Sequence, residues 1–257
     1  MKVTILGCGA SGGVPLIGND WGDCDPDEPR NRRRRSSILI EGEGTTILID
    51  SSPDCRAQLL DAGVDRLDAV IYTHAHADHI HGIDDLRGVN IAMDAMIPAY
   101  GSAMTLEQIN TRFGYAFAPL DLKARGYFYK PCLDPKPVGE GKFRVGGLEI
   151  QPIRQDHGFS ITLGLRIGSF AYSVDVVELD DRAFDLLEGI DSWVVGCLGR
   201  HPHPTHGHLD KVLGWIERVG PQRAWLSHMG QYLDYGTLCG ELPSHIVPAH
   251  DGLTIEV

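Results

Sequence analysis

The stretch VIYTHAHADHIHG, residues 70–82, constrains this chain more than any other part of it. It begins as an apolar run typical of a short buried strand and passes directly into a loop crowded with imidazole. Four of the chain's 12 histidines fall within eight residues here, at His74, His76, His79 and His81. A strand end is a rigid platform, so the loop that follows it can aim several side chains at one point.

The spacing H-x-H-x-D-H in this loop predicts a metal site. His74 and His76 alternate by two and can reach one cation together, while Asp78 and His79 can reach a second. Imidazole nitrogen and carboxylate oxygen form the ligand set of zinc, manganese and iron sites, and a metal explains why neutral imidazoles cluster. A polar surface loop with chance histidines is the alternative, which the position directly after an apolar strand disfavours. His81 falls outside the spacing and receives at most a supporting role.

Two cations need about six ligands, so the loop requires partners further along the chain. Three residues share its setting, because each follows an apolar strand: His157 after LEIQPIRQD, Asp175 after FAYSV, and His228 after RAWLS. Strand ends that meet at one edge of a sheet are where α/β folds place their sites. We therefore expect these three residues to converge on the histidine loop.

The elements around the loop predict layered α/β sheets covered by helices, in a single domain over residues 1–257. A tight turn is expected at Glu43-Gly44. Strands are expected where apolar and β-branched residues run together, at 2–7, 36–42, 45–52, 67–74, 148–157, 161–168, 170–175, 192–197 and 223–228.

Two helices carry clear boundary signals. In the first, Ser52 is expected to cap the helix, Pro53 suits its first turn, and Gly63 can end it. In the second, residues 208–220, apolar side chains recur on one face and Gly220 stops the helix. Residues 84–140 mix proline, glycine and aromatic residues, and we assign no elements to them.

Composition narrows the class of protein. Hydrophobic residues make up 42% of the chain, enough for a full core, and the net charge of −12 argues against non-specific coating of nucleic acid. No stretch approaches the roughly 20 apolar residues of a membrane span, and the first residues, MKVTILG, resemble a strand rather than a signal peptide. We therefore expect a cytoplasmic protein with no membrane partner, whose six scattered cysteines are reduced.

One basic run, RNRRRR from Arg30 to Arg35, stands out in this acidic chain. The simpler interpretation is a solvated surface loop. The sharper interpretation is that the run steers phosphate towards a site. The sequence leaves both open.

In these motifs the chain resembles the metallo-β-lactamase superfamily of metal-dependent hydrolases. The likeness covers nearly the whole chain: a glycine-rich first turn, ILID before THAHADH, and then His, Asp and His in order. Within the superfamily the chain is most similar to the cyclic phosphodiesterases associated with carbon–phosphorus lyase, through SGGVPLIG, DEPRNRRRRSS, RFGYAF and LDYGTL, and more distantly to the tRNA 3′-processing endonucleases. The resemblance implies a metallo-β-lactamase-type αβ/βα four-layer sandwich, with two sheets face to face and helices outside.

The same resemblance assigns metal ligands and cofactors. It implies two divalent ions, zinc or manganese, and it is compatible with a homodimer. The implied ligands are His74, His76 and His157 for the first ion, Asp78, His79 and His228 for the second, and Asp175 as the bridge between them.

One segment departs from the pattern of this branch. Relatives often carry a third, structural zinc site built on C-x-C-x-x-C shortly after the GVPxIG motif. Asn19 and Trp21 stand where two of those cysteines are expected, and only Cys24 remains. A structural zinc site needs about four soft or imidazole ligands, so we expect the third site to be missing and Cys24 to be a simple thiol.

The loop RHPHPTHGHLD, residues 200–210, supplies candidates for a catalytic histidine. The resemblance implies a histidine 22 residues before the last metal ligand, and His206 has that spacing to His228. We therefore expect His206 to act as general acid or phosphate ligand, with His208 as the alternative. His201 and His203 are expected to be exposed loop residues.

Two further residues receive supporting roles. Asp50, at the end of TTILID, is expected to orient a metal-binding histidine. Arg200 is a candidate contact for substrate phosphate, as is the basic run.

Together these features predict a dinuclear phosphodiesterase that hydrolyses a small phosphodiester, such as a ribosyl cyclic phosphate or a nucleotide. Attack by a metal-bridging hydroxide is expected, with Asp78 and Asp175 holding the metals and His206 assisting the leaving group. The alternatives are a tRNA 3′-end endonuclease, which usually needs a basic, glycine-rich arm, and a lactone or thioester hydrolase on the same fold. A diiron redox module and a ligand-binding protein without turnover are disfavoured, because the loop keeps its histidines and all the ligands are present.

Overall fold

The structure is a computed structural model that describes residues 1–120 and 128–257. Its strands form two sheets. The first contains β1 (Lys2–Gly7), β2 (Ser37–Gly42), β3 (Thr45–Ile49), β4 (Ala69–Ile71), β5 (Ile97–Ser102), β6 (Leu133–Val138) and β14 (Thr254–Glu256). The second contains β7 (Phe143–Val145), β8 (Leu148–Asp156), β9 (Ile161–Ile167), β10 (Phe170–Ser173), β11 (Ser192–Gly196), β12 (Arg223–Ser227) and β13 (Ile246–Pro248).

Helices connect these strands on the outside of both sheets. The α-helices are α1 (Cys55–Asp61), α2 (Ala77–Ile80), α3 (Leu86–Met93), α4 (Ala103–Phe117), α5 (Asp181–Leu187), α6 (Leu209–Val219) and α7 (Tyr235–Glu241). Two short 3₁₀ helices are η1 (Pro29–Asn31) and η2 (Ile83–Asp85). Within the described residues, no helix is both long enough and apolar enough to cross a membrane.

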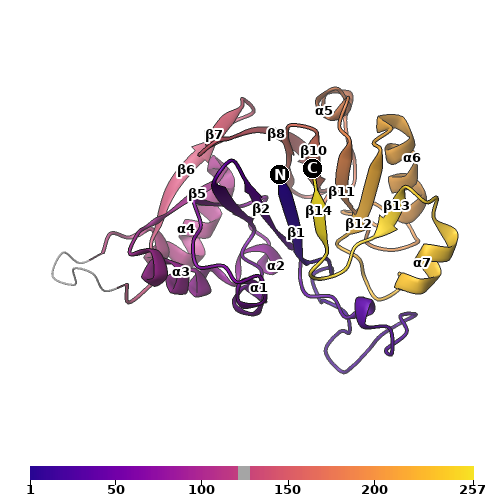
Figure 1. Ribbon diagram of the computed structural model, residues 1–257, viewed down its shortest axis with the longest axis horizontal. Helices are drawn as coiled ribbons and strands as arrows, with labels where there is room; N and C mark the ends of the chain where they lie inside the picture. Colours follow the sequence, from indigo (N-terminus) through magenta and orange to yellow (C-terminus); the bar gives the residue numbers. More distant parts are fainter. Residues whose placement is uncertain (121–127) are drawn as a thin grey trace.

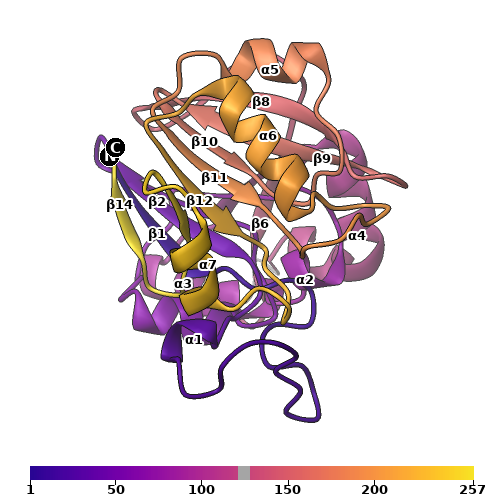
Figure 2. The same cartoon turned by 90° about the vertical axis from the view of Figure 1, so that its right-hand side faces the viewer.

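The two sheets pack face to face. In the described residues each has seven strands, in the orders β14-β1-β2-β3-β4-β5-β6 and β13-β12-β11-β10-β9-β8-β7. Alternate residues of β2 divide between two cores: Ile38 and Ile40 join the core shared with the second sheet, and Leu39 joins the core under α1, α3 and α4. Figure 2 shows α5 and α6 over the second sheet, so the predicted four-layer sandwich is confirmed.

The topology gathers strand ends at one edge of the molecule. Strands β3 to β6 run parallel to one another, and so do β10 to β13. The chain leaves β4 directly into the histidine loop, which lies at the carboxyl end of its strand, where α/β sheets place their sites. β1 pairs antiparallel with β14, so the two ends of the chain lie side by side, as Figure 1 shows.

The strands predicted from apolar runs are all present, with shorter bounds at several ends. Glu43 and Gly44 both adopt left-handed backbone angles, with φ of 51° and 68°, as the predicted tight turn requires. Gly63 after α1 and Gly220 after α6 each have φ of 65° and end their helices as predicted. Residues 84–140, which received no assignment, contain α3, β5, α4 and β6, and their stretch 121–127 lies outside the described residues.

The predicted cap of α1 is wrong. The helix begins at Cys55 with Asp54 at its N-cap, so Ser52 and Pro53 both precede it. Asp54 is fixed from outside the helix, because its carboxylate accepts the backbone N–H of Arg35 at 2.9 Å and pairs with that residue's guanidinium at 2.7 Å. Ser52 still contributes before the helix, since its Oγ accepts the backbone N–H of Asp54 at 3.1 Å, while the contact with Arg35 fixes the Asp54 side chain.

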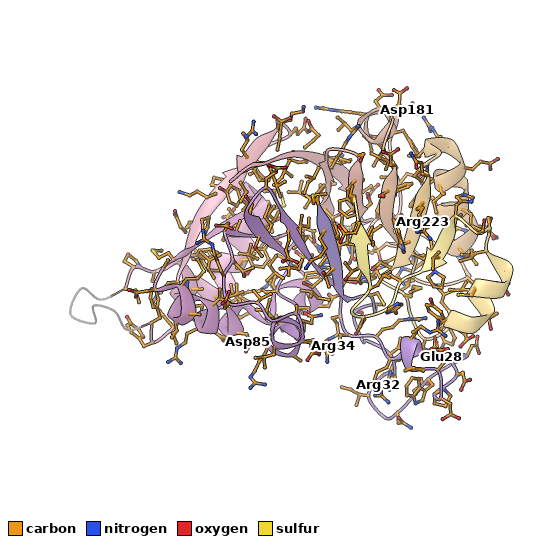
Figure 3. All side chains as sticks on the ribbon, viewed as in Figure 1. Glu28, Arg32, Arg34, Asp85, Asp181 and Arg223 are labelled. Atoms are coloured by element: carbon orange, nitrogen blue, oxygen red, sulfur yellow. The ribbon has the colours of Figure 1, made fainter. Side chains whose placement is uncertain are left out.

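The basic run divides between surface and interior. Arg33 is only 2% exposed, and its guanidinium donates to the carbonyl oxygens of Leu233 at 2.6 Å and Gly230 at 3.1 Å. The interpretation as a solvated loop is therefore wrong for Arg33, since it fastens the segment after β1 to the loop after β12. Arg32 and Arg34, from the same segment, lie towards the outside of the protein (Figure 3), and Arg34 pairs with Asp61 at 2.6 Å.

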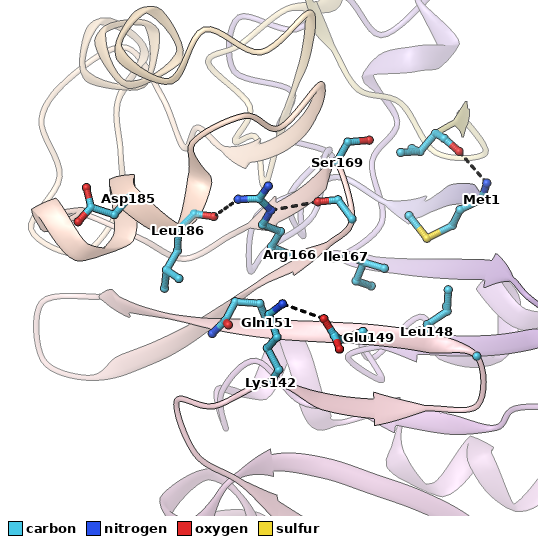
Figure 4. Close-up of a pocket in the computed structure, with 13 residues that line it drawn as sticks. Met1, Lys142, Leu148, Glu149, Gln151, Arg166, Ile167, Ser169, Asp185 and Leu186 are labelled. Atoms are coloured by element: carbon cyan, nitrogen blue, oxygen red, sulfur yellow. Dashed lines mark hydrogen bonds and ion pairs between the residues drawn. The ribbon is translucent and has the colours of Figure 1, made fainter.

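A cavity of about 660 Å³ lies at the end of β9 and β10 that is opposite Asp175. Figure 4 shows its wall, where Arg166 donates to the carbonyl oxygen of Leu186 at 2.7 Å and Lys142 pairs with Glu149 at 2.8 Å. None of the predicted site residues lines it, so it is separate from the candidate metal centre.

Candidate metal centre

The predicted ligands converge in the structure. Two groups of side chains each offer ligand atoms that lie within 4.8 Å of one another, and Asp175 belongs to both. This arrangement matches the predicted ligand sets, whose roles at metal ions stay a prediction. The first group is His74, His76, His157 and Asp175, and the second is Asp78, His79, Asp175 and His228.

At three positions in or next to the cluster, the chain turns sharply just after a strand ends. Asp50 follows β3, Asp175 follows β10 and His228 follows β12, and their φ angles are 61°, 52° and 52°. Left-handed backbone at a residue with a side chain costs roughly 1–3 kcal/mol and concentrates at functional sites. Here it lets the chain reverse directly after the strand while the side chain faces the cluster.

The histidine loop itself continues into the short helix α2. His76 occupies the N-cap with extended backbone angles, and Asp78 and His79 lie in the single turn that follows. His79 and His74 are almost wholly buried, whereas His76 is exposed. The loop thus starts in the protein interior at His74, is exposed at His76 and returns to the interior at His79.

The hydrogen bonds behind the cluster leave the facing nitrogens open. His79 Nδ1 lies 2.7 Å from Asp50 Oδ2, and His157 Nδ1 lies 2.6 Å from the carbonyl oxygen of Thr205. Because a carboxylate and a carbonyl only accept, each Nδ1 carries the proton, and each Nε2 presents a lone pair when the ring is neutral. Asp50 thus contacts His79 as expected, and its role in orienting a metal-binding histidine stays a prediction.

Within the described residues, three buried polar atoms at the centre have no hydrogen-bond partner, although each lies 3.1–3.4 Å from an oppositely charged or ionisable group of the cluster. These atoms are His74 Nε2, His79 Nε2 and Asp175 Oδ1. Leaving such atoms unpaired costs about 1–3 kcal/mol each, so a native protein has reason to satisfy them with a ligand. Imidazole and carboxylate donors at these positions fit a divalent cation of the zinc or manganese type.

The charges of the cluster also favour a cation. Burial opposes a charge on His79, yet Asp175, Asp50 and Asp78 together raise its pKa well above the usual value. Burial lowers the pKa of His157 to about 4, so that ring is neutral at pH 7. The carboxylates around His79 therefore favour positive charge at the centre, which a bound proton supplies in the absence of a metal and a divalent cation would supply on displacing that proton.

His206 stands beside the two ligand groups. Its Nε2 lies 3.5 Å from Asp175 Oδ2, and its ring stacks on that of His228 with centroids 5.1 Å apart. On the other side, His206 Nδ1 lies 2.7 Å from Thr205 Oγ1 and 3.2 Å from His203 Nδ1. The structure thus brings His206 to the cluster, and it links His203, which was expected to be an exposed loop residue only, to the same ring.

Other candidates lie apart from the cluster. Within the described residues, no hydrogen bond or ion pair joins the side chain of His208 to it, and His208 forms the N-cap of α6. Arg200 pairs with Glu241 at 2.8 Å. His81 is exposed, with its ring 5.7 Å from that of Phe113.

Cys24 is a buried thiol, as expected for a residue without its two partner cysteines. Its Sγ lies 3.9 Å from Arg33 Nη1, and burial is the main reason that its pKa is raised. All six cysteines are free thiols in the structure.

Residues 45–229 match the family described as Beta-lactamase superfamily domain. This range contains every residue of the two ligand groups. The chain belongs to the beta-lactamase superfamily. Membership of that superfamily and the His and Asp cluster together support a metal-dependent hydrolase.

Relatives within the superfamily narrow the comparison. A solved structure described as a new diphosphatase from the PhnP family is 32% identical, with a TM-score of 0.89, and the match covers 100% of this chain and 96% of that one. At this identity and coverage, the likeness places the chain with the PhnP family as well.

Curated relatives match over part of their length. A Porphyromonas gingivalis protein (strain ATCC BAA-308 / W83) named Octanoyltransferase is 33% identical over 98% of this chain and 51% of its own length. Ribonuclease Z of Clostridium kluyveri (strain ATCC 8527 / DSM 555 / NBRC 12016 / NCIMB 10680 / K1) is 25% identical over 72% of this chain and 52% of its own length. The chain therefore spans about half the length of these curated relatives.

Several contributors to the site escaped the sequence reasoning. Thr205 supports both His157 and His206, and Ser36 Oγ lies 3.0 Å from His228 Nδ1. Ser and Thr are too common for their position to signal such a role. The contact with His157 uses the backbone carbonyl of Thr205, which any residue would supply, so only the position of Thr205 directly before His206 was a usable signal.

Proposed function

We propose that this chain is a two-metal phosphodiesterase that hydrolyses a small phosphodiester, such as a ribosyl cyclic phosphate or a nucleotide. The observation that carries the proposal is the position of His206. It is an additional imidazole, outside both ligand groups, whose Nε2 lies 3.5 Å from the shared carboxylate of Asp175. A phosphoryl group spreads charge over several oxygens, so an extra donor beside the metals favours phosphoester chemistry.

The ligand residues would hold two divalent ions. His74, His76 and His157 would face one ion, Asp78, His79 and His228 the other, with Asp175 shared. Such ions supply Lewis acidity towards phosphoryl oxygens and lower the pKa of water. Asp50 accepts the Nδ1 proton of His79, so that the Nε2 of the neutral ring keeps its lone pair towards the centre.

His206 would bind a phosphoryl oxygen or protonate the departing oxygen through Nε2. The Thr205 hydroxyl, 2.7 Å from Nδ1, can donate to that nitrogen and so keep the proton on Nε2. The stack of His206 on His228 fixes the plane of the ring. The histidine is thus oriented by its neighbours before substrate arrives, which is the arrangement that general acid catalysis needs.

A tRNA 3′-end endonuclease is the competing function, and the similarity to ribonuclease Z favours considering it. The net charge of −12 weakens this alternative, since a protein that grips tRNA relies on phosphate neutralisation by Lys and Arg. A precursor tRNA substrate at modest salt separates the two functions, because only the endonuclease cleaves it.

The deciding experiment measures turnover of bis(p-nitrophenyl) phosphate by protein loaded with zinc or manganese. We expect turnover by the wild type, none by Asp175→Ala, and about 10²–10⁴-fold less by His206→Ala, the contribution of a positioned acid. Gln222→Ala, at a surface position paired with Asp191, is the matched control. Absence of turnover by metal-loaded wild type, together with hydrolysis of a lactone or thioester, would overturn the proposal.

A further inference from the structure

A second cavity, of about 460 Å³, opens beside the candidate metal centre. The loop after β11 forms one wall, through Leu198 and His203, and the loop after β12 forms another, through Gln231 and Tyr232. Asp23, from the segment between β1 and β2, closes the third side. None of the seven predicted ligand residues lines this cavity, so the metal site alone does not explain it.

His203 connects the cavity to the centre. Its side chain lines the cavity, and its Nδ1 lies 3.2 Å from Nδ1 of His206, whose opposite nitrogen faces Asp175. His203 thus lies on the side of His206 that faces away from Asp175, with the two ring centroids 5.0 Å apart. A substituent of a phosphoryl group bound beside His206 would pass along that ring to enter the cavity.

The walls have the chemistry of a flat, partly apolar group with a polar edge. Tyr232 is 54% exposed, and its ring is available for stacking. Leu198 supplies an apolar surface. Within the described residues, no hydrogen bond or ion pair occupies the carboxylate of Asp23 or the side-chain amide of Gln231, so both can pair with donor and acceptor groups of a ligand.

The walls are also held in place. Arg33 donates to the carbonyl oxygens of Gly230 and Leu233, on either side of Gln231 and Tyr232. The backbone N–H of Asp23 donates to the carbonyl oxygen of Gln231 at 3.0 Å. A cavity with fixed walls binds a rigid group at a lower entropic cost than a mobile loop does.

We propose that this cavity is a nucleobase subsite, so that the substrates of the centre are nucleotide phosphodiesters rather than base-free sugar phosphates. The base stacks on Tyr232 and directs its N–H edge to Asp23. The proposal rests on the proposed phosphodiesterase function, because the subsite is defined relative to a phosphoryl group at the metals. Guanine fits best, since its adjacent N1–H and amino groups can both donate to one carboxylate.

The test compares two product-like ligands that differ only in the base: guanosine 5′-monophosphate and ribose 5-phosphate. Each is titrated into zinc-loaded protein by calorimetry, and each is used as an inhibitor of bis(p-nitrophenyl) phosphate turnover. Stacking on an aromatic side chain contributes about 1–3 kcal/mol per base, so the nucleotide should bind about 5- to 150-fold more tightly.

The variants Tyr232→Leu and Asp23→Asn locate the effect. Each should weaken guanosine 5′-monophosphate by roughly tenfold and leave ribose 5-phosphate within about twofold of wild type. Tyr115→Leu, at an exposed tyrosine that contacts Asp84, is the control and should change neither. Equal binding of the two ligands by wild type, or unchanged nucleotide binding by Tyr232→Leu, overturns the subsite.

The two proposals fail in different ways. Without turnover of any phosphodiester, the phosphodiesterase function fails, while calorimetry still reports whether the base is recognised. With turnover but no preference for the nucleotide over ribose 5-phosphate, the function stands and the subsite fails.

Discussion

Replacing Asp50 by asparagine should weaken metal binding without touching a metal ligand. The carboxylate is fully buried and accepts three hydrogen bonds: from the backbone N–H of Thr73 at 2.8 Å, from the Thr73 hydroxyl at 2.7 Å, and from His79 Nδ1 at 2.7 Å. Asparagine keeps one acceptor oxygen and turns an NH₂ group towards the remaining donors. Oδ2 accepts from His79 and from the Thr73 hydroxyl, and Oδ1 accepts from the Thr73 backbone, so either orientation of the amide sets its NH₂ against a buried donor. In one orientation His79 loses its partner or places its proton on Nε2, the nitrogen that faces the cluster; in the other the clash is with the Thr73 N–H, which displaces the side chain that holds His79.

The size of the effect follows from this geometry. Loss of a partner that orients a metal-binding histidine typically lowers metal affinity by about 10–100-fold. His79 is fully buried and relies on Asp50 alone for its Nδ1 contact within the described residues, so we expect the upper part of that range. The lost carboxylate charge acts in the same direction, because Asp50 contributes to the raised pKa of His79.

Competition with a zinc chelator measures the affinity directly, and circular dichroism verifies that the variant is folded. Asp68→Asn is the matched control: Asp68 also accepts a backbone N–H, from Thr46 at 2.9 Å, but it precedes β4 and so lies at the opposite end of that strand from His74. The control should bind zinc as the wild type does. A folded Asp50→Asn variant with zinc affinity within about threefold of wild type would refute the orienting role.

Three further predictions concern stability. Arg33→Met should lower the free energy of unfolding in urea by about 2–5 kcal/mol, because two buried carbonyl oxygens lose their donor. The control Arg32→Met should change the free energy of unfolding by less than about 0.5 kcal/mol. Similar losses in both variants would contradict the prediction. Burial opposes the charged form of Asp234, but hydrogen bonds from the backbone of Thr237 and Asp25 lower the pKa of its carboxyl from 3.8 to about 2. Its contribution to the free energy of unfolding is therefore complete above pH 4 and is lost as the pH falls towards 2. Parallel stability profiles of the wild type and an Asp234→Asn variant between pH 5 and pH 2 would exclude this contribution. Saturating zinc should raise the free energy of unfolding by about 4 kcal/mol at 1,000 times its Kd, and an unchanged melting temperature after chelation would show that the cluster holds no metal.

The histidine loop was predictable because its chemistry is local. Spacing within residues 74–79 and the apolar strand before them are both visible in the sequence, and the partners His157, Asp175 and His228 share one signal, a strand end. The superfamily resemblance ordered these residues into two groups. Neither source could place His203 against His206, since that contact depends on the path of a loop rather than on any periodic pattern.

The role of Arg33 lay beyond prediction for a different reason. Its acceptors at Gly230 and Leu233 are 197 and 200 residues away in the chain, and a run of six basic-rich residues gives no sign that one of them faces inward. A contact from outside the helix also acts at the N-cap of α1, where Arg35 pairs with Asp54, the residue whose backbone N–H Ser52 accepts. In both cases the contact joins residues too far apart in the chain for a local pattern to reveal it.

The residues with left-handed backbone angles also depend on contacts with other strands. Asp50 is held in its left-handed conformation by its neighbours: its N–H donates to the carbonyl oxygen of Ile71 at 2.9 Å, and its own carbonyl accepts the Ser37 hydroxyl at 2.9 Å. Asp175 is held likewise, since its carbonyl accepts the hydroxyl of Thr162 at 3.0 Å. Strain of roughly 1–3 kcal/mol per residue survives only where the surrounding structure fixes the backbone on several sides. The sheets therefore do more than present strand ends at one edge. Their side-chain hydroxyls also hold the left-handed backbone at Asp50 and Asp175, which directs both carboxylates towards the histidines.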